Sequence, residues 1–76
     1  MEIQIIQDDL FFSRKFSDYY SIFGSIEIEE ETEIEVAIWT DTIHFENDKI
    51  RYKMFSNIET AKNYILKTLT NYNPIS

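Results

Sequence analysis

Six glutamates lie between positions 27 and 35, within the stretch SIEIEEETEIEVAIW that spans residues 25–39. They are Glu27, Glu29, Glu30, Glu31, Glu33 and Glu35. Because β-branched residues alternate with many of them, the stretch predicts a hairpin with a charged face, and a turn at 30–32. Carboxylates in this number suggest three kinds of chemistry, which are acid–base catalysis, binding of a hard cation and attraction of a basic partner.

Catalysis and metal binding are the weaker predictions. Paired carboxylates that hydrolyse glycosides need a concave cleft, which a chain of 76 residues seldom encloses. The sequence has no cysteine, no glycine-rich phosphate loop and a single histidine, His44. His44 and Glu46 offer two metal ligands where a useful site needs three or four, and no loop has the pattern that wraps Ca²⁺. We therefore expect no enzyme activity, no metal and no cofactor.

Charge is segregated along the chain. Ten acidic residues and no lysine or arginine lie between Phe16 and Asp48, and the net charge is −7. Such a charge disfavours direct binding to nucleic acid or to anionic membranes and favours a basic protein partner. Glutamates that face one another across a hairpin also destabilise it. Either a function selects for these glutamates despite the loss of stability, or solvent and salt make that loss unimportant.

Three interpretations of the acidic face remain open. Rows of carboxylates on a twisted ribbon can imitate a nucleic-acid backbone and compete for a basic channel, with Trp39 and Phe45 as apolar anchors. The face can instead bind an ordinary protein partner, or it can be a solvated edge that prevents aggregation. The predicted contact residues are Glu27, Glu29, Glu30, Glu31, Glu33, Glu35, Trp39 and Asp41.

The expected architecture is a single α+β domain over residues 1–76, in the order β-α-β-β-β-β-α. We expect an antiparallel meander of about four to five strands with two helices packed on one face. The first strand is predicted over 1–6. A helix is predicted over 9–23, because Phe12, Phe16, Tyr19 and Phe23 are spaced by four, three and four, and Gly24 would end it.

The second half predicts three further features. Residues 40–42 form a short link, after which Ile43 and Phe45 continue the inward set, and Asn47-Asp48 form a tight turn. In the last strand Ile50, Tyr52 and Met54 face inward, which leaves Lys49, Arg51 and Lys53 outside, where they offset the glutamates or protect an edge. A helix follows over 57–71, with Ser56 and Glu59 as a capping box and Asn73-Pro74 as its end. Its apolar stripe is Ile58, Ala61, Ile65, Leu69 and Tyr72.

The segment IEIEEETEIEV, the short length and the absence of cysteine resemble the small acidic inhibitors that phages and mobile elements encode, including anti-CRISPR proteins and other DNA mimics. The likeness is one of type and covers about a third of the chain. It implies a stoichiometric inhibitor that blocks a nuclease or its DNA-binding cleft.

We therefore expect a noncatalytic protein-binding inhibitor that contacts a basic nucleic-acid site through the acidic hairpin. An immunity protein or antitoxin that neutralises a basic toxin is the alternative, and a small structural or regulatory subunit is a third class. No signal peptide or membrane span is predicted, so the expected location is the cytosol. Homodimerisation stays open.

Overall fold

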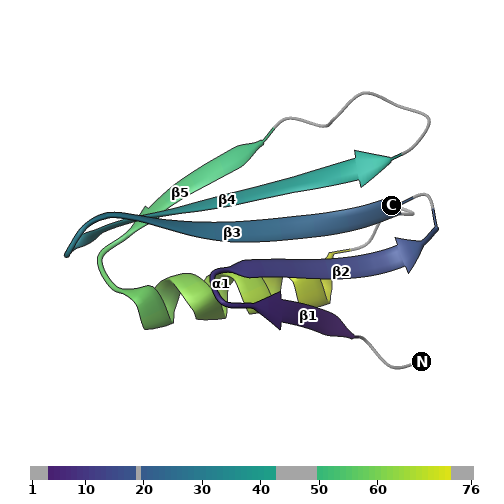
Figure 1. The fold of residues 1–76 in the computed structure, drawn as a ribbon, viewed down its shortest axis with the longest axis horizontal. Helices are drawn as coiled ribbons and strands as arrows, with labels where there is room; N and C mark the ends of the chain where they lie inside the picture. The colour runs from purple at the N-terminus through teal and green to yellow at the C-terminus, as the bar shows by residue number, and fades with distance from the viewer. Residues whose placement is uncertain (1–3, 19, 43–49, 73–76) are drawn as a thin grey trace.

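A five-stranded antiparallel sheet carries one helix on one of its faces (Figure 1). The computed structural model describes residues 4–18, 20–42 and 50–72, with the backbone alone for 41 and 42. The elements are β1 (Ile5–Asp8), β2 (Phe11–Ser17), β3 (Tyr20–Glu30), β4 (Glu33–Thr42), β5 (Arg51–Phe55) and α1 (Ile58–Asn71). Strand order in the sheet follows chain order, so the α+β class and the antiparallel meander are confirmed.

The helix predicted over 9–23 is wrong, and with it the second helix of the predicted architecture. These residues form β2 and the first part of β3, joined to β1 by a turn in which Asp9 has a φ of 55°. Phe12 is fully buried beneath α1, whereas its neighbour Phe11 is on the opposite face and 41% exposed. This alternation is that of a strand. The step of four from Phe12 to Phe16 also keeps both rings on one side of a strand, and the following step of three crosses the turn between β2 and β3, so the aromatic spacing imitates a helix.

Strands β3 and β4 form the long central hairpin of the sheet. Ile26 pairs with Val36 and Ile28 with Ile34, which confirms the predicted alternation and places the turn at Glu31-Thr32. Residues 40–42 are not a link, because β4 continues through Thr42 and pairs with β3 as far as Tyr20. Buried isoleucine and valine side chains of both strands make the inner face of the sheet.

The predicted orientation of the last strand is wrong. Val36 faces α1 and pairs with Lys53, so Lys53 and Arg51 lie on the helix side of β5, whereas Tyr52 and Met54 lie on the other side. The Lys53 Nζ lies 4.6 Å from the centre of the Tyr64 ring, so its charge contacts an aromatic side chain of α1. Arg51 and Lys53 therefore do not offset the glutamates of the hairpin.

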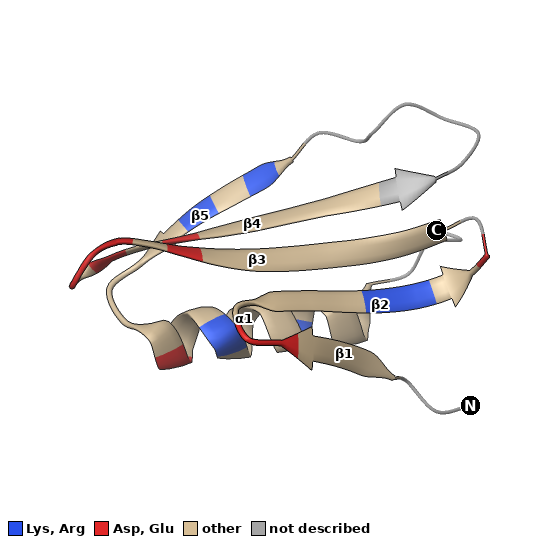
Figure 2. Cartoon of the chain, viewed as in Figure 1, with Lys and Arg blue, Asp and Glu red and all other residues tan. Residues whose placement is uncertain are grey.

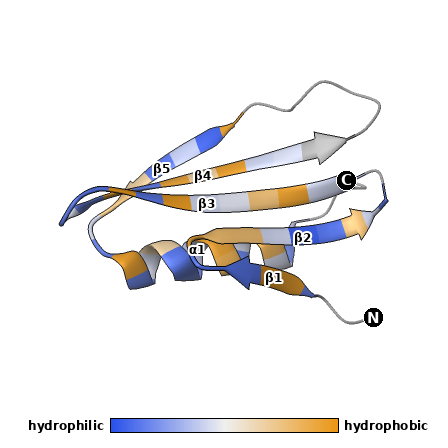
Figure 3. Cartoon of the chain, viewed as in Figure 1, coloured by the Kyte–Doolittle hydropathy of each residue, from blue (hydrophilic) through white to orange (hydrophobic). Residues whose placement is uncertain are grey.

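Helix α1 closes the core with three fully buried side chains, Ala61, Ile65 and Leu69. They recur every fourth residue and pack against the buried side chains of the sheet. Figure 3 shows orange segments along α1 and along the strands above it. The predicted apolar stripe is confirmed. The predicted capping box is wrong, because the N-cap is Asn57, whose Oδ1 accepts a 2.8 Å hydrogen bond from the Thr60 amide.

Gly24 permits the close approach of α1 to the sheet. It lies in the middle of β3 with no positive φ, so it is not the predicted helix C-cap. A Cβ atom at this position would lie 2.7 Å from the Ile65 Cγ2 atom, which is closer than van der Waals contact allows. The missing side chain therefore sets the distance between helix and sheet.

Arg14 ties the end of α1 to strand β2. Its Nη1 donates hydrogen bonds to the carbonyl oxygens of Leu69 at 2.6 Å and Thr70 at 3.1 Å. The last turn of α1 contains no basic residue of its own. Arg14 therefore supplies from another element the positive charge that a helix C-terminus favours.

Several predictions fall outside the described residues. They concern residues 1–3 of the first strand, Tyr19, Ile43, His44, Phe45, Glu46, Asn47-Asp48, Lys49 and Asn73-Pro74. Within the part of the chain that the structure describes, no helix has the length and apolar character needed to cross a membrane.

We expect Gly24→Ala to lower the free energy of unfolding by roughly 1–3 kcal/mol, because α1 must move away from the sheet to accept the methyl group. Urea denaturation measures the change. Ser25→Ala is the control, because Ser25 lies on the face away from α1 and its loss is expected to change stability by no more than about 0.5 kcal/mol. Equal stability of the two variants would contradict this packing.

We expect Arg14→Met to destabilise the fold by roughly 1–3 kcal/mol, because the carbonyl oxygens at the end of α1 lose a charged donor. Thermal unfolding followed by circular dichroism measures the loss. The matched control is Arg51→Met, which removes an exposed arginine from an edge strand and is expected to have little effect. An equally large loss of stability in Arg51→Met would contradict this, because it would show that the loss comes from removing a positive charge and not from losing the hydrogen bonds to α1.

Candidate acidic and aromatic interface

The hairpin glutamates gather at one end of the sheet. Glu27 pairs directly with Glu35 across the two central strands. Carboxylate oxygens of Glu27, Glu29 and Glu35 all lie within 4.8 Å of one another. The other hairpin glutamates, Glu30, Glu31 and Glu33, surround the turn and are exposed. Figure 2 shows this end of the β3–β4 hairpin in red, extending past the first turn of α1.

No described cation of the chain neutralises this cluster. The salt bridge of the described residues joins Lys15 to Asp18 at 3.1 Å, on the link between β2 and β3. Arg14 is bound at the end of α1, and Lys53 lies over the Tyr64 ring on the opposite side of the sheet. The carboxylates of Glu27, Glu29 and Glu35 therefore face solvent as an uncompensated group of negative charges.

Three aromatic rings pack on the same face of the sheet as the glutamates. The Phe23 ring stacks on Trp39 with their centroids 5.6 Å apart, and Phe11 lies 5.8 Å from Phe23 and 6.1 Å from Trp39. We call Phe11, Phe23 and Trp39 the outer aromatic cluster. Helix α1 covers the other face of the sheet, so these three rings are not part of the core that lies beneath the helix. The predicted anchor Trp39 is thus on the expected face.

Two small residues separate the aromatic cluster from the glutamates. Along the central hairpin the outward pairs are Phe23 with Trp39, then Ser25 with Ala37, then Glu27 with Glu35. Successive outward pairs on one strand are separated by roughly 6.6 Å. The sheet face thus changes from aromatic to small to anionic along a single pair of strands.

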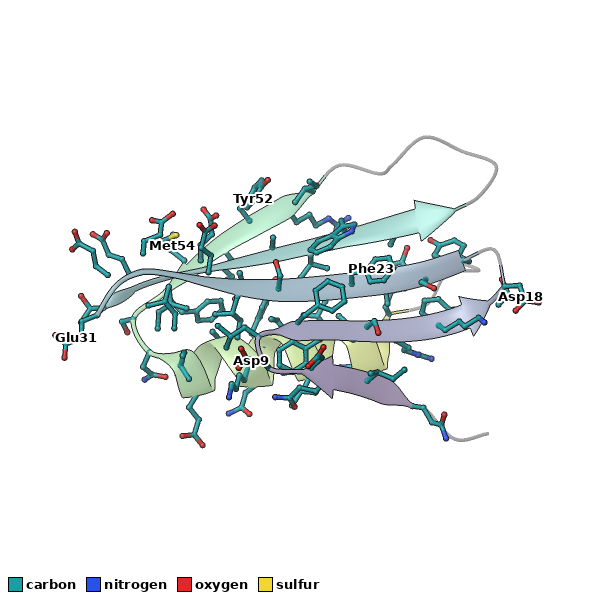
Figure 4. The ribbon with its side chains drawn as sticks, viewed as in Figure 1. Asp9, Asp18, Phe23, Glu31, Tyr52 and Met54 are labelled. Carbon is teal, nitrogen blue, oxygen red and sulfur yellow. The ribbon has the colours of Figure 1, made fainter. Side chains whose placement is uncertain are left out.

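Strand β5 extends this face with two exposed apolar side chains. Tyr52 pairs with Ala37 and is 61% exposed, and Met54 pairs with Glu35 and is 51% exposed. Figure 4 shows both pointing away from α1, with Glu31 at the tip of the hairpin. Exposed aromatic and methionine side chains beside charged groups are common in surfaces that bind proteins. We refer to the outward side chains of β2–β5 as the open face.

The open face suits recognition of positive charge better than catalysis. Three carboxylates on extended strands lack the wrapping loop and additional ligands that specific Ca²⁺ sites provide. Their pairing on exposed strands also provides no enclosed reaction space. Aromatic rings and carboxylates together attract cationic groups.

A hollow lies mainly on the helix side of the sheet, between α1 and the strands. It has a volume of about 540 Å³, its lining includes Ile22, Ile38, Tyr64 and Thr68, and it extends to Trp39. The charged group of this lining is Arg51, which is exposed at the sheet edge. Among the described lining residues no second charge accompanies it, so we assign this hollow no ligand.

Comparisons of the chain with protein-family models, with curated proteins and with solved structures find no match. The open face is therefore the feature of the molecule that bears on its function.

The structure brings together most of the predicted contact residues and adds others. All six hairpin glutamates and Trp39 lie on the hairpin as expected, while the side chain of Asp41 and the whole of Phe45 lie outside the described residues. Phe23, Tyr52 and Met54 are not predicted as contact residues, because the sequence pattern places them on a helix or on the inner face, whereas Phe11 is expected to be an exposed aromatic side chain that could line a partner interface. The adjacent pair Phe11-Phe12 was the available signal, since a strand sends such neighbours to opposite faces.

We expect Glu27→Gln to raise the free energy of unfolding by about 0.2–1 kcal/mol, because it removes repulsion from both Glu29 and Glu35. The gain should shrink as salt screens the charges. Urea titrations at low and high ionic strength measure it. Glu59→Gln, which removes a carboxylate from the first turn of α1, should give no gain. A loss of stability in Glu27→Gln would contradict the repulsion.

Proposed function

We propose that the chain is a noncatalytic protein-binding inhibitor whose acidic hairpin occupies a basic nucleic-acid-binding site of a nuclease or defence complex, in the manner of an anti-CRISPR protein or other DNA mimic. The observation that carries the proposal is the group of three uncompensated carboxylates within 4.8 Å on a projecting hairpin. A basic site that normally holds phosphates gains favourable interactions when it meets such a group.

The instability of the carboxylate group supports a binding role. Like charges opposite one another weaken the very hairpin that forms the centre of the sheet. Binding to a basic surface would turn this repulsion into attraction, because the partner's cations neutralise it. Solubility alone does not require three carboxylates to converge, since separated charges on any exposed face serve it equally well.

The outer aromatic cluster supports the same role through a different interaction. Long-range charge mainly accelerates association, whereas rings that lose contact with water on binding provide much of the affinity. Trp39 and Phe23 are half-buried and lie two outward pairs away from the glutamates. A partner that covers the hairpin therefore also reaches these rings.

We expect the immobilised protein to capture nucleic-acid enzymes from a bacterial lysate and to release them when short duplex DNA is added, because DNA and the hairpin compete for one site. Mass spectrometry identifies the released proteins. The variant with Glu27, Glu29 and Glu35 changed to glutamine should capture much less, and added salt should weaken capture by the unmodified chain.

The matched control changes Asp9 and Asp18 to asparagine and Glu59 to glutamine. Both triple variants have a net charge of −4, but the control leaves the hairpin intact. Capture by the control at the level of the unmodified chain supports the proposal. Equal losses in the two variants, or release that is insensitive to DNA, would contradict it. Capture of a toxin nuclease would favour the immunity-protein alternative over a defence target.

A further inference from the structure

We propose that the open face contains a binding position for an arginine side chain, centred on Ala37 and bounded by Trp39, Tyr52 and Glu35. This inference rests on the proposed function, because it specifies which cation of a basic protein partner the face receives. The position is defined by strand register and not by the glutamates alone.

The register surrounds Ala37 with larger outward side chains. Tyr52 pairs with it from β5 and Ser25 from β3, while Glu35 and Trp39 are its outward neighbours along β4. Phe11 pairs with Ser25, yet its ring lies 6.1 Å from Trp39, so the ring leans across β3. The small side chain of Ala37 therefore leaves a depression in the open face, which we call the low point. Aromatic rings lie on two sides of it and carboxylates on a third.

The spacing fits one planar cation. Trp39 and Glu35 are four residues apart on an extended strand, a distance of roughly 13 Å between their Cα atoms. Both side chains extend from the outer side of the sheet, one on each side of Ala37 along β4, and we place one guanidinium between them. Arginine can then stack on the ring with one side of its plane and donate two hydrogen bonds to the carboxylate at its edge.

The combination of rings and carboxylates selects arginine over lysine. A guanidinium is planar and weakly hydrated, so it leaves water readily and stacks on aromatic faces. The ammonium group of lysine is strongly hydrated, so the carboxylates attract it but the aromatic rings add little to its binding. Carboxylates attract both cations, whereas tryptophan, the best aromatic partner of a cation, adds a stacking interaction that favours arginine here.

No described lysine or arginine of the chain fills this position. In the described part of the chain, Arg51 and Lys53 lie on the other side of β5, and Arg14 is held at the end of α1. Lys15 forms its ion pair with Asp18. The cation has to come from a partner, and charge complementarity with Glu27, Glu29 and Glu35 commits the occupant to an arginine of a basic protein segment.

Trp39 is the single tryptophan of the chain, so its fluorescence reports on the position directly. We would titrate the full chain with a short capped peptide of alternating arginine and glycine, and with the matching lysine peptide. The expected result is binding of the arginine peptide roughly fivefold or more tightly than the lysine peptide, with a change in Trp39 emission.

Two variants test which residues cause the preference for the arginine peptide over the lysine peptide. Ala37→Ile fills the low point and should reduce binding of the arginine peptide to the level of the lysine peptide. Tyr52→Thr removes one ring from an exposed edge position and should reduce the preference in part. Circular dichroism checks the fold of both, and because Tyr52 is 61% exposed, its variant decides the question if Ala37→Ile does not fold.

The triple glutamine variant separates this inference from the proposed function. Equal binding of the two peptides, lost in the triple variant, would overturn the arginine position and leave the acidic decoy standing. A preference for arginine that survives in both Ala37→Ile and Tyr52→Thr would also overturn it. Absence of binding, or binding that the triple variant retains, would overturn the inference and the proposed function together.

Discussion

The close packing of α1 on the inner face of the sheet is the contact on which the rest of the structure depends. It requires the absence of a side chain at Gly24, where a Cβ atom would lie 2.7 Å from Ile65. One helix covers one face of the sheet, so strand alternation sends every second side chain of β2–β5 to a face with no described cover. The aromatic cluster and the converging glutamates are both consequences of this one-sided arrangement.

Sequence patterning predicted the parts of the fold where a single period dominates. The hairpin alternates β-branched and acidic residues, and α1 repeats apolar residues every fourth position, so both were correct apart from the capping residue. The helix predicted over residues 9–23 was wrong because a step of four residues also keeps two side chains on one side of a strand, and the step of three crosses the turn between β2 and β3. Local spacing cannot reveal that turn, which is defined by the pairing of β2 with β3.

The orientation of β5 was wrong for a related reason. Tyr52 and Met54 are more apolar than their neighbours Arg51 and Lys53, and an apolar set is normally assigned to the core. Here the Lys53 Nζ lies over the Tyr64 ring of α1, while Tyr52 joins the open face. The candidate site was therefore predicted as an acidic surface anchored by Trp39, and the aromatic side chains of β2 and β5 joined it only through the pairing of these strands.

We propose that the open face, and not the helix-covered side, receives a cationic partner. The decisive experiment is a heteronuclear NMR titration of the labelled chain with the arginine–glycine peptide. We expect shifts of the amides of Ser25, Glu35 and Ala37 and of the Trp39 indole, with those of α1 nearly unchanged. Shifts concentrated in α1, or around Arg51 and Thr68 at the hollow behind the sheet, would contradict it.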